Sequence, residues 1–357
     1  MNLRTPGPTP IPDEIMEAML QPMVDHRGPE FAGILPEITD NLKKLFITQN
    51  DVLVLSASGS GGIEAAVVNC LSPGETVLAI SIGSFGERLG KIAEIYGANV
   101  IWLRKEWGST ASPEEIGTIL KENKKITTVL VTHNETSTGV TNPLKQISEE
   151  VKKYNKLLIV DAVSSLGSLP CPVDEWNLDV VVTGSQKGWM VPPGLAMVSM
   201  SERAWEANSK ATMPRAYFDL QAARNYSERG QTPWTPALSL FNALNLSLKL
   251  MVEEGLENIH LRHQEVGNKV RQSVKSMGFS LFPIDESYCS NTVTAINVPE
   301  GIDGQELRKQ TRSRGVVFAG GQGKLSSSIF RIGHLGYIPD AEIDEALAVL
   351  REVATIK

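Results

Sequence analysis

Apolar and charged segments alternate along the first half of the chain. Runs rich in valine, leucine and isoleucine predict strands, and several segments between them show the spacing of amphipathic helices. Because the strand runs are continuously apolar, we expect most of them to be buried on both faces of a mostly parallel, doubly wound α/β sheet. The predicted strands are 52–55, 76–80, 99–103, 127–132, 157–161, 180–183 and 195–199, and the predicted helices are 86–97, 113–124 and 143–154.

The pattern changes towards the C-terminus. A long helical periodicity leads into further strand-like and helix-like segments, which together predict a smaller α+β domain. At the other end, "TPGPTPIP" is too rich in proline for a helix or a central strand and predicts an extended arm. The long helical segment is 237–268, the strand-like segments are 291–298 and 316–319, and the helix-like segments are 304–314 and 340–354. We therefore predict an N-terminal arm (1–20), a large domain (21–255) and a small C-terminal domain (256–357).

The composition excludes several classes of function. The formal net charge is −7, which does not favour binding to nucleic acid or to an acidic membrane surface. No uninterrupted apolar run approaches the roughly 20 residues needed to cross a bilayer, and the N-terminus has no signal-peptide pattern. The three cysteines are widely spaced and the five histidines are scattered. We therefore predict no metal site and no disulfide framework, as is typical of a cytoplasmic protein.

Candidate chemistry stands where the predicted strands end, because ligands of doubly wound sheets bind beyond the carboxyl ends of the strands. After 52–55, the small residues 58–62 run directly into a helix, which would make either a phosphate cradle or a tight turn. Phe85 follows the next strand and could stack on a planar ring, although core packing is the commoner use of such an aromatic. The polar "HNETSTGV" after 127–132 could orient a ligand or form turn hydrogen bonds.

Two further strand ends carry charged groups. Asp161 ends an apolar strand, where a carboxylate is costly without a partner, although it could also cap a turn. Lys187 stands just past 180–183 in "GSQKGWMVPPG", and a partly buried amine has a lowered pKa and can condense with an aldehyde. Together these strand ends describe a site for pyridoxal 5′-phosphate. It would combine an amine for the aldehyde, an acid for the pyridinium nitrogen, an aromatic side chain for the ring face and a cradle for the phosphate.

These motifs also resemble a known family. "SGSGGIEAA", "GSFGER", "THNETSTGV", "VDAVSSLG" and "GSQKGWMVPPG" are similar to segments of the class V aminotransferases of fold type I, particularly the alanine–glyoxylate and serine–glyoxylate aminotransferases. The resemblance extends from "TPGPTPIP" to "FRIGHLG" in the family's order, so it covers nearly the whole chain. It implies the PLP-dependent transferase fold type I, pyridoxal 5′-phosphate as cofactor, and a homodimer with shared active sites.

The resemblance also assigns roles around the cofactor ring. Lys187 matches the lysine that forms the Schiff base, and Asp161 matches the acid that pairs with the pyridine nitrogen. Val163 and Phe85 would pack against the two faces of the ring, and Phe85 stands where the family often has tryptophan or tyrosine. Thr136 matches the hydroxyl that bonds the phenolic oxygen.

Other matches concern the cofactor's phosphate. Ser60 and Gly61 match phosphate-binding positions, and Gln186 would assist them. A threonine from the partner subunit also reaches the phosphate in this family. Thr235 in "RGQTPWTPALSL" is the predicted equivalent, with Thr232 as the alternative.

The activity that the resemblance implies is a ping-pong transfer of an amino group from a small L-amino acid, alanine or serine, to glyoxylate or pyruvate. Arg331 in "FRIGHLG" matches the arginine that binds the substrate α-carboxylate. An aminotransferase for aspartate or 2-aminoethylphosphonate is an alternative, although no second anion-binding arginine is obvious and Arg27 is interpreted as structural. A cysteine desulfurase would need a catalytic cysteine shortly before Arg331, and Cys289 lies well upstream. A last alternative is an interaction subunit associated with a soluble hydrogenase.

Overall fold

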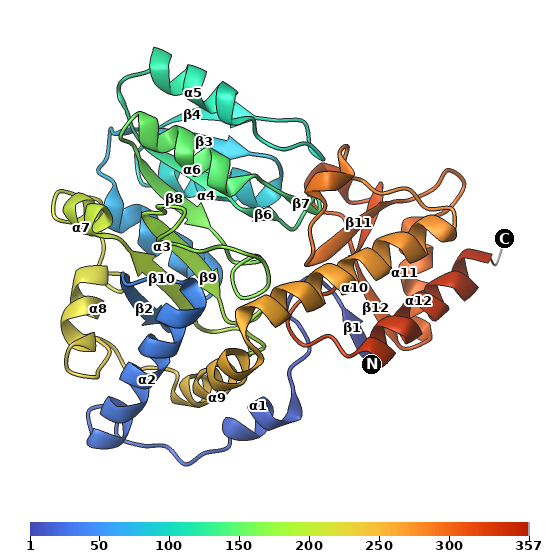
Figure 1. Ribbon diagram of the computed structural model, residues 1–357, viewed down its shortest axis with the longest axis horizontal. Helices are drawn as coiled ribbons and strands as arrows, with labels where there is room; N and C mark the ends of the chain where they lie inside the picture. Colours follow the sequence, from blue (N-terminus) through green and yellow to red (C-terminus); the bar gives the residue numbers. More distant parts are fainter. Residues whose placement is uncertain (356–357) are drawn as a thin grey trace.

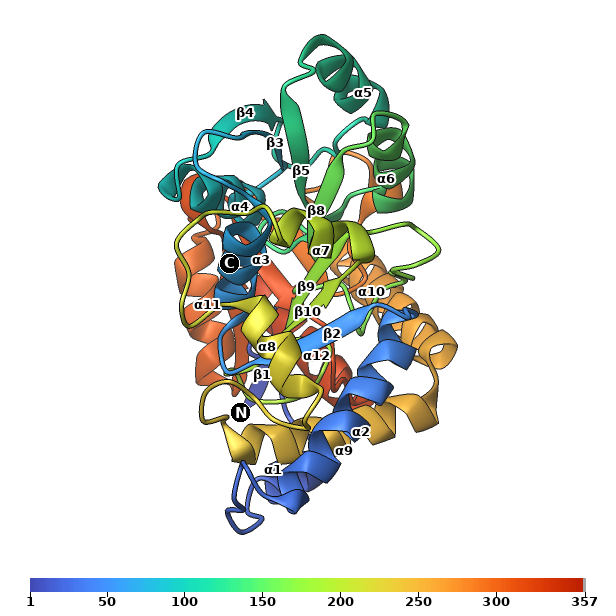
Figure 2. The same ribbon diagram turned by 90° about the vertical axis from the view of Figure 1, so that its left-hand side faces the viewer.

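The computed structural model describes residues 1–355 and is built around a seven-stranded sheet of order β2-β10-β9-β8-β5-β3-β4 (Figures 1 and 2). Only β10 runs antiparallel to its neighbours, so the prediction of a mostly parallel sheet is confirmed. The observed bounds lie close to the predicted ones: β2 (Asp51–Leu55), β3 (Thr76–Ser81), β4 (Asn99–Arg104), β5 (Ile126–Thr132), β8 (Leu157–Asp161), β9 (Val180–Gly184) and β10 (Ala196–Met200).

Helices cover both faces of this sheet, because successive apolar side chains of each strand point to opposite faces. In β8, for example, Leu158 and Val160 belong to one hydrophobic cluster while Leu157 and Ile159 belong to the other. The edge strand β4 is the exception, since it is only partly buried. One layer contains α2 (Pro29–Phe46), α5 (Pro113–Glu122), α6 (Leu144–Lys153) and α9 (Leu238–Glu254); the other contains α3 (Gly59–Cys70), α4 (Ser84–Ile95), α7 (Glu202–Asn208) and α8 (Leu220–Ser227).

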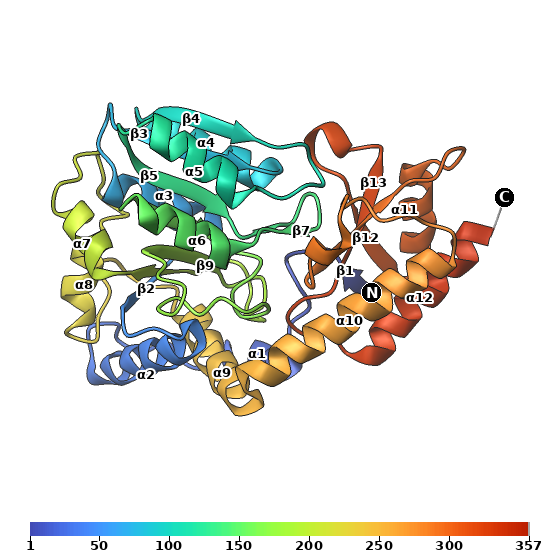
Figure 3. The same cartoon turned by 45° about the horizontal axis from the view of Figure 1, so that its top comes forward.

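A second, four-stranded sheet of order β1-β12-β13-β11 lies beside the first (Figure 3). Its apolar face packs against three helices, and this forms a separate core cluster. The segment "TPGPTPIP" forms neither helix nor strand, as expected, and the residues on either side of it supply β1, which pairs in parallel with β12, and α1 (Asp13–Ala18). The elements are β1 (Asn2–Arg4), β11 (Val293–Asn297), β12 (Val316–Gly320), β13 (Ile329–Gly333), α10 (Leu256–Ser276), α11 (Gly304–Ser313) and α12 (Asp340–Thr355).

The long helical segment predicted at 237–268 is two helices. Gly255 has a φ of +81°, a conformation that side-chain-bearing residues rarely adopt. The chain therefore breaks between α9 and α10, and α10 continues to Ser276. Within residues 1–355 the structure contains no helix with the length and apolar character of a membrane span.

The N-terminal segment connects the two sheets next to the predicted site. After β1, the backbone N–H of Thr9 donates to the carbonyl of Gln186 at 3.2 Å, just beyond β9. The carbonyl of Pro6 accepts a hydrogen bond from the Lys187 ammonium. The start of the chain thus crosses from the small sheet to the carboxyl edge of the large one.

Trp189 gives a test of how this region is held. Its side chain is fully buried, stacks on Phe46 with ring centroids 5.7 Å apart, and donates its indole N–H to the Thr183 hydroxyl at 2.8 Å. We expect Trp189→Ala to lower the free energy of unfolding by about 3–5 kcal/mol, as is usual for a buried aromatic. Urea denaturation measures this, with Trp189→Phe as a control that keeps most of the packing. A loss below about 1 kcal/mol in Trp189→Ala would contradict the expectation.

Candidate active site

A cavity of about 220 Å³ lies at the carboxyl edge of the large sheet, between the N-terminal segment, α3, the first turns of α4 and the ends of β8 and β9. Larger hollows exist, including one of about 570 Å³ beside α11, but the predicted cofactor residues gather in the smaller one. Six of them line it together: Ser60, Phe85, Asp161, Val163, Gln186 and Lys187.

Lys187 supplies a buried amine to this cavity, with 8% of the residue exposed. Burial lowers the pKa of the amine to about 8, and the nearby positive charge of Arg331 adds to the effect while Asp161 opposes it. A substantial fraction of the amine is therefore neutral near physiological pH, which is the form that attacks a carbonyl carbon.

Asp161 ends β8, and 3% of the residue is exposed. Its Oδ1 accepts the backbone N–H of Val163 at 2.9 Å, so it does cap a turn. Burial raises the pKa of the carboxyl to about 6, and the negative charge of Glu135 contributes. Oδ2 has no hydrogen-bond donor in the part of the chain described, and a protonated ring nitrogen in the cavity would supply one.

The first turn of α3 has the free N–H groups that the phosphate of pyridoxal 5′-phosphate would need. The backbone N–H groups of Gly59 and Ser60 have no acceptor within residues 1–355, and the helix dipole favours an anion there. Arg88 donates to the Ser60 hydroxyl at 3.3 Å and has no carboxylate partner among the described residues. The buried Oε1 of Gln186 also lacks a partner. The free N–H groups of Gly59 and Ser60 and the Arg88 guanidinium are consistent with a bound anion at this end of the cavity, whereas the Gln186 oxygen is an acceptor and would need a donor.

Gly61 differs from Gly59 and Ser60 in that its N–H already has an acceptor, and its role at the phosphate stays a prediction. Its N–H donates to the Ser58 side chain at 3.3 Å, and a Cβ there would point at Ala57 and Phe218. Since the helix begins at Gly59, the glycine that faces the cavity is Gly59, where a Cβ would lie 2.9 Å from Val163.

Phe85 and Val163 both line the cavity, as expected for the two faces of a ring slot. The Arg88 guanidinium lies 4.8 Å from the centroid of the Phe85 ring. Arg88 was not singled out from the sequence, although its position one turn after the aromatic in "SFGER" is a usable signal, because residues three apart share a helix face.

Thr136 and Arg331 lie next to each other but do not line this cavity. The Thr136 hydroxyl donates to Ser164 at 2.8 Å, and its carbonyl accepts from Arg331 Nη1 at 2.9 Å. Arg331 Nε donates to the Gly320 carbonyl at 2.9 Å. The guanidinium is buried, which lowers its pKa to about 10, and its hydrogen-bond partners do not include a carboxylate. The negative charge of Glu135 opposes this shift, and a substrate carboxylate would give the guanidinium a direct hydrogen-bonded partner.

The two candidate threonines differ in availability. Thr232 is buried, and its hydroxyl donates a hydrogen bond to the carbonyl of Trp234, 2.7 Å away in the same chain. Thr235 is exposed, and neither threonine lines the cavity that contains Lys187. Arg27 donates to the carbonyls of Thr232 and Pro233, which fits the structural role expected of it.

Glu135 is the second residue that sequence reasoning missed. It lies in the hairpin of β6 (Asn134–Glu135) and β7 (Val140–Thr141) and is fully buried. In the sequence it stands among hydroxyl and amide residues of "HNETSTGV" with no local sign of a special role.

Comparison with known proteins identifies the family of the chain. The model of the family "Aminotransferase class-V" matches residues 1–333. The chain belongs to this family. Members of this fold family use pyridoxal 5′-phosphate, and the residues around the cavity fit that group.

Individual relatives cover nearly the whole chain. The "Soluble hydrogenase 42 kDa subunit" of Anabaena cylindrica is 43% identical over 98% of this chain and 92% of its own. The L-aspartate–glyoxylate aminotransferase of Paracoccus denitrificans is 39% identical over 94% of this chain and 86% of its own. The crystal structure of alanine–glyoxylate aminotransferase from Nostoc sp. has a TM-score of 0.94 and 31% identity, covering 99% of this chain and 94% of that one.

The lowered pKa of Lys187 predicts how its amine reacts as the pH rises. The neutral fraction, and with it the rate of reductive methylation by formaldehyde, increases through about pH 8 and then levels off. Peptide mass spectrometry of the cofactor-free protein measures this rate at Lys187 and at exposed lysines. The amines of exposed lysines ordinarily have a pKa of about 10.4. If the methylation rate at Lys187 rose over the same pH range as the rate at the exposed lysines, the lowered pKa of the buried amine would be contradicted.

Proposed function

We propose that the protein is a pyridoxal 5′-phosphate-dependent aminotransferase that moves the amino group of a small L-amino acid, alanine or serine, to glyoxylate or pyruvate. The observation that carries the proposal is the presence of Lys187 and Asp161 in one cavity, beside an anion cradle at the start of α3. Two of the relatives described above act on glyoxylate according to their names, and their amino donors differ.

The residues of the cavity would hold the cofactor at three points. Lys187 would hold its aldehyde carbon, Asp161 its ring nitrogen, and the first turn of α3 with Arg88 its phosphate. When bound, the cofactor supplies an electron sink for the negative charge that develops at the α-carbon of the amino acid.

The protein's own groups perform the remaining work. Arg331 would bind the substrate α-carboxylate through two parallel N–H groups, which fixes the direction of the Cα–H bond. Lys187, as a neutral amine, would take the proton from Cα and return a proton in the second half of the reaction. Because donor and acceptor use the same groups, the first product leaves before the second substrate enters, which gives ping-pong kinetics.

The proposed preference for a small donor rests on the arginines near the site. Arg331 is the residue we assign to the α-carboxylate, Arg88 lies beside the phosphate cradle, and Arg27 is occupied by backbone carbonyls. A donor with a second acidic group, such as aspartate, would need one more cation, and Arg308, which lies beside Gly320 and whose charge acts on Arg331, is available for that role. Activity with aspartate and 2-aminoethylphosphonate is therefore included in the test.

Absorbance spectroscopy tests the proposal. We expect the purified protein with pyridoxal 5′-phosphate to show a visible band that Lys187→Ala lacks. Alanine or serine should bleach the band, and glyoxylate or pyruvate should restore it, because the two half-reactions run in opposite directions. Aspartate and 2-aminoethylphosphonate serve as comparison donors.

A visible band that responds to none of these donors would contradict the aminotransferase proposal. It would favour instead an interaction subunit of the kind that the name of the Anabaena relative suggests. Bleaching by aspartate alone would contradict only the small-donor preference.

We also propose that two copies of the chain complete each other's sites. Thr235 is exposed beside Trp234, whose ring stacks on that of Tyr217 with centroids 5.9 Å apart. Both aromatics are 48% exposed, and exposed aromatics are enriched where proteins associate. Thr235 would reach the partner's phosphate, since the hydroxyl of Thr232 is already engaged.

Mixing two inactive variants tests this arrangement. Thr235→Glu places a negative charge against the phosphate, and Lys187→Ala removes the amine, so each homodimer should be inactive. If the sites are shared, dissociation and random reassociation of the mixture restores about a quarter of the wild-type sites. Thr232→Val is the matched control and should retain activity on its own. No recovery in the mixture, with mixed dimers present, would contradict the shared site.

A further inference from the structure

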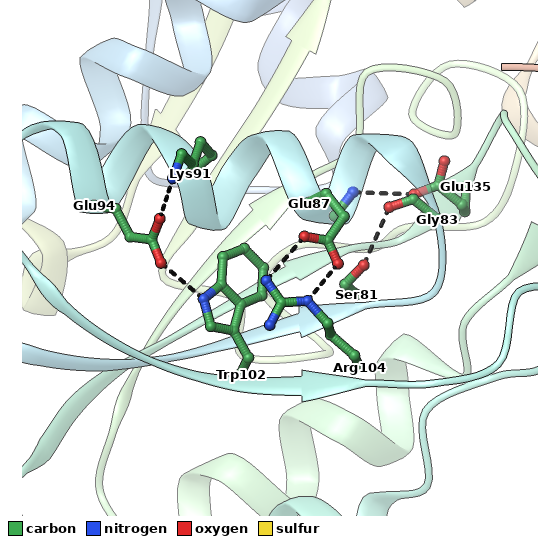
Figure 4. A network of polar contacts seen from close by, with 9 residues as sticks. Ser81, Gly83, Glu87, Lys91, Glu94, Trp102, Arg104 and Glu135 are labelled. Atoms are coloured by element: carbon green, nitrogen blue, oxygen red, sulfur yellow. Dashed lines mark hydrogen bonds and ion pairs between the residues drawn. The ribbon is translucent and has the colours of Figure 1, made fainter. Parts of the chain in front are cut away.

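Glu135 is a fully buried carboxylate at the N-terminus of α4. Its two oxygens accept the backbone N–H of Phe85 at 3.1 and 3.2 Å and that of Gly86 at 3.0 Å. They also accept the backbone N–H of Ser137 at 3.2 Å and its hydroxyl at 2.5 Å. Figure 4 shows the carboxylate at the end of α4 where the helix begins. Four donors and the helix dipole stabilise a negative charge there, although burial raises the pKa of the carboxyl.

The chain before α4 is shaped to admit this side chain. A Cβ at Gly83 would lie 2.4 Å from Glu135 Cγ, so only glycine allows the approach. The Ser81 hydroxyl fixes the Gly83 carbonyl at 3.1 Å, and the Ser84 N–H donates to the Ser137 hydroxyl at 3.0 Å. The contact between α4 and the β6–β7 hairpin is therefore specific in shape as well as in charge.

This contact joins two parts of the candidate site. The first turns of α4 carry Phe85 and Arg88, which line the cavity. The residue after Glu135 is Thr136, whose carbonyl accepts from Arg331. Glu135 touches neither the cavity nor Arg331 directly, yet it fixes the segments that carry the groups expected at the ring, the phosphate and the substrate carboxylate.

We propose that Glu135 is a positioning residue for cofactor binding: it holds the start of α4 so that Phe85 and Arg88 face the ring and the phosphate. This inference rests on the proposed function only in taking pyridoxal 5′-phosphate as the group that enters the cavity. It requires no turnover, because the role concerns how the cofactor is held.

Glu135→Gln tests the proposal with little change in volume. Glutamine has one acceptor oxygen, so its NH₂ group must face at least one of the N–H or O–H donors that the carboxylate now accepts. We expect the dissociation constant for pyridoxal 5′-phosphate, measured by absorbance titration, to rise roughly tenfold to a hundredfold, as for loss of a charge-assisted hydrogen bond. We also expect the visible circular dichroism of the bound cofactor to change, because that signal reports how its ring is held.

Glu94→Gln is the matched control, since Glu94 lies in α4 at the end opposite to the one that Glu135 contacts (Figure 4). It accepts from the Trp102 indole and from Lys91, each at 2.8 Å, and lies outside the cavity lining. It should leave cofactor affinity within about twofold, the change expected of an independent, partly exposed site. A general weakening of α4 would instead affect both variants alike.

Ser137→Ala keeps the test decisive if Glu135→Gln does not fold. It removes one donor to the carboxylate and the acceptor of the Ser84 N–H, so we expect a smaller change in the same direction. Cofactor affinity and dichroism indistinguishable from wild type in the folded variants, or equal losses in Glu94→Gln, would overturn the inference. Failure of the proposed function has a different signature: the wild-type protein would bind the cofactor without responding to any amino donor.

Discussion

The site depends on the burial of an amine and a carboxylate at the ends of two neighbouring parallel strands. Asp161 ends β8 and Lys187 follows β9, and these strands pair in register from Ile159 opposite Val180. Both groups are almost inaccessible to water, so burial moves their pKa values towards each other, to about 6 and about 8. An acid and an amine held in that range are typical of groups that exchange protons near neutral pH.

The charges around this pair explain why the rest of the site is arranged as it is. Neither Arg331 nor Arg88 forms an ion pair with a carboxylate among the described residues. The carboxylate of Glu135 accepts hydrogen bonds from four other donors. Arg331 is buried, and a buried cation without an ion-pair partner is costly unless an anion enters, whereas Arg88 is exposed to solvent. The proposed ligands carry two such anions, a phosphate and an α-carboxylate. In the proposed function, these positive charges would be in place before the anionic ligands bind, and such preorganisation would fix the orientation at Cα.

The main features of the fold and of the site could be predicted from the sequence because they follow from local patterns. Continuous apolar strands identified the sheet, and the sheet identified the edge where Asp161 and Lys187 meet. The exact start of the helix could not be fixed from the sequence, and the structure places it at Gly59, whose N–H has no acceptor in the described part of the chain. The break at Gly255 depends on a single positive φ inside a convincing helical pattern. Glu135 was missed because its contact with α4 is made through two backbone N–H groups some fifty residues earlier, and backbone donors leave no trace in a sequence.

The central claim is that Lys187 is the attachment point of the cofactor. It is tested most directly by incubating the purified protein with pyridoxal 5′-phosphate, reducing it with borohydride and mapping the modified peptide by mass spectrometry. The account predicts one dominant adduct on Lys187, present near one per chain. Adducts spread over exposed lysines, with Lys187 unmodified, would contradict it.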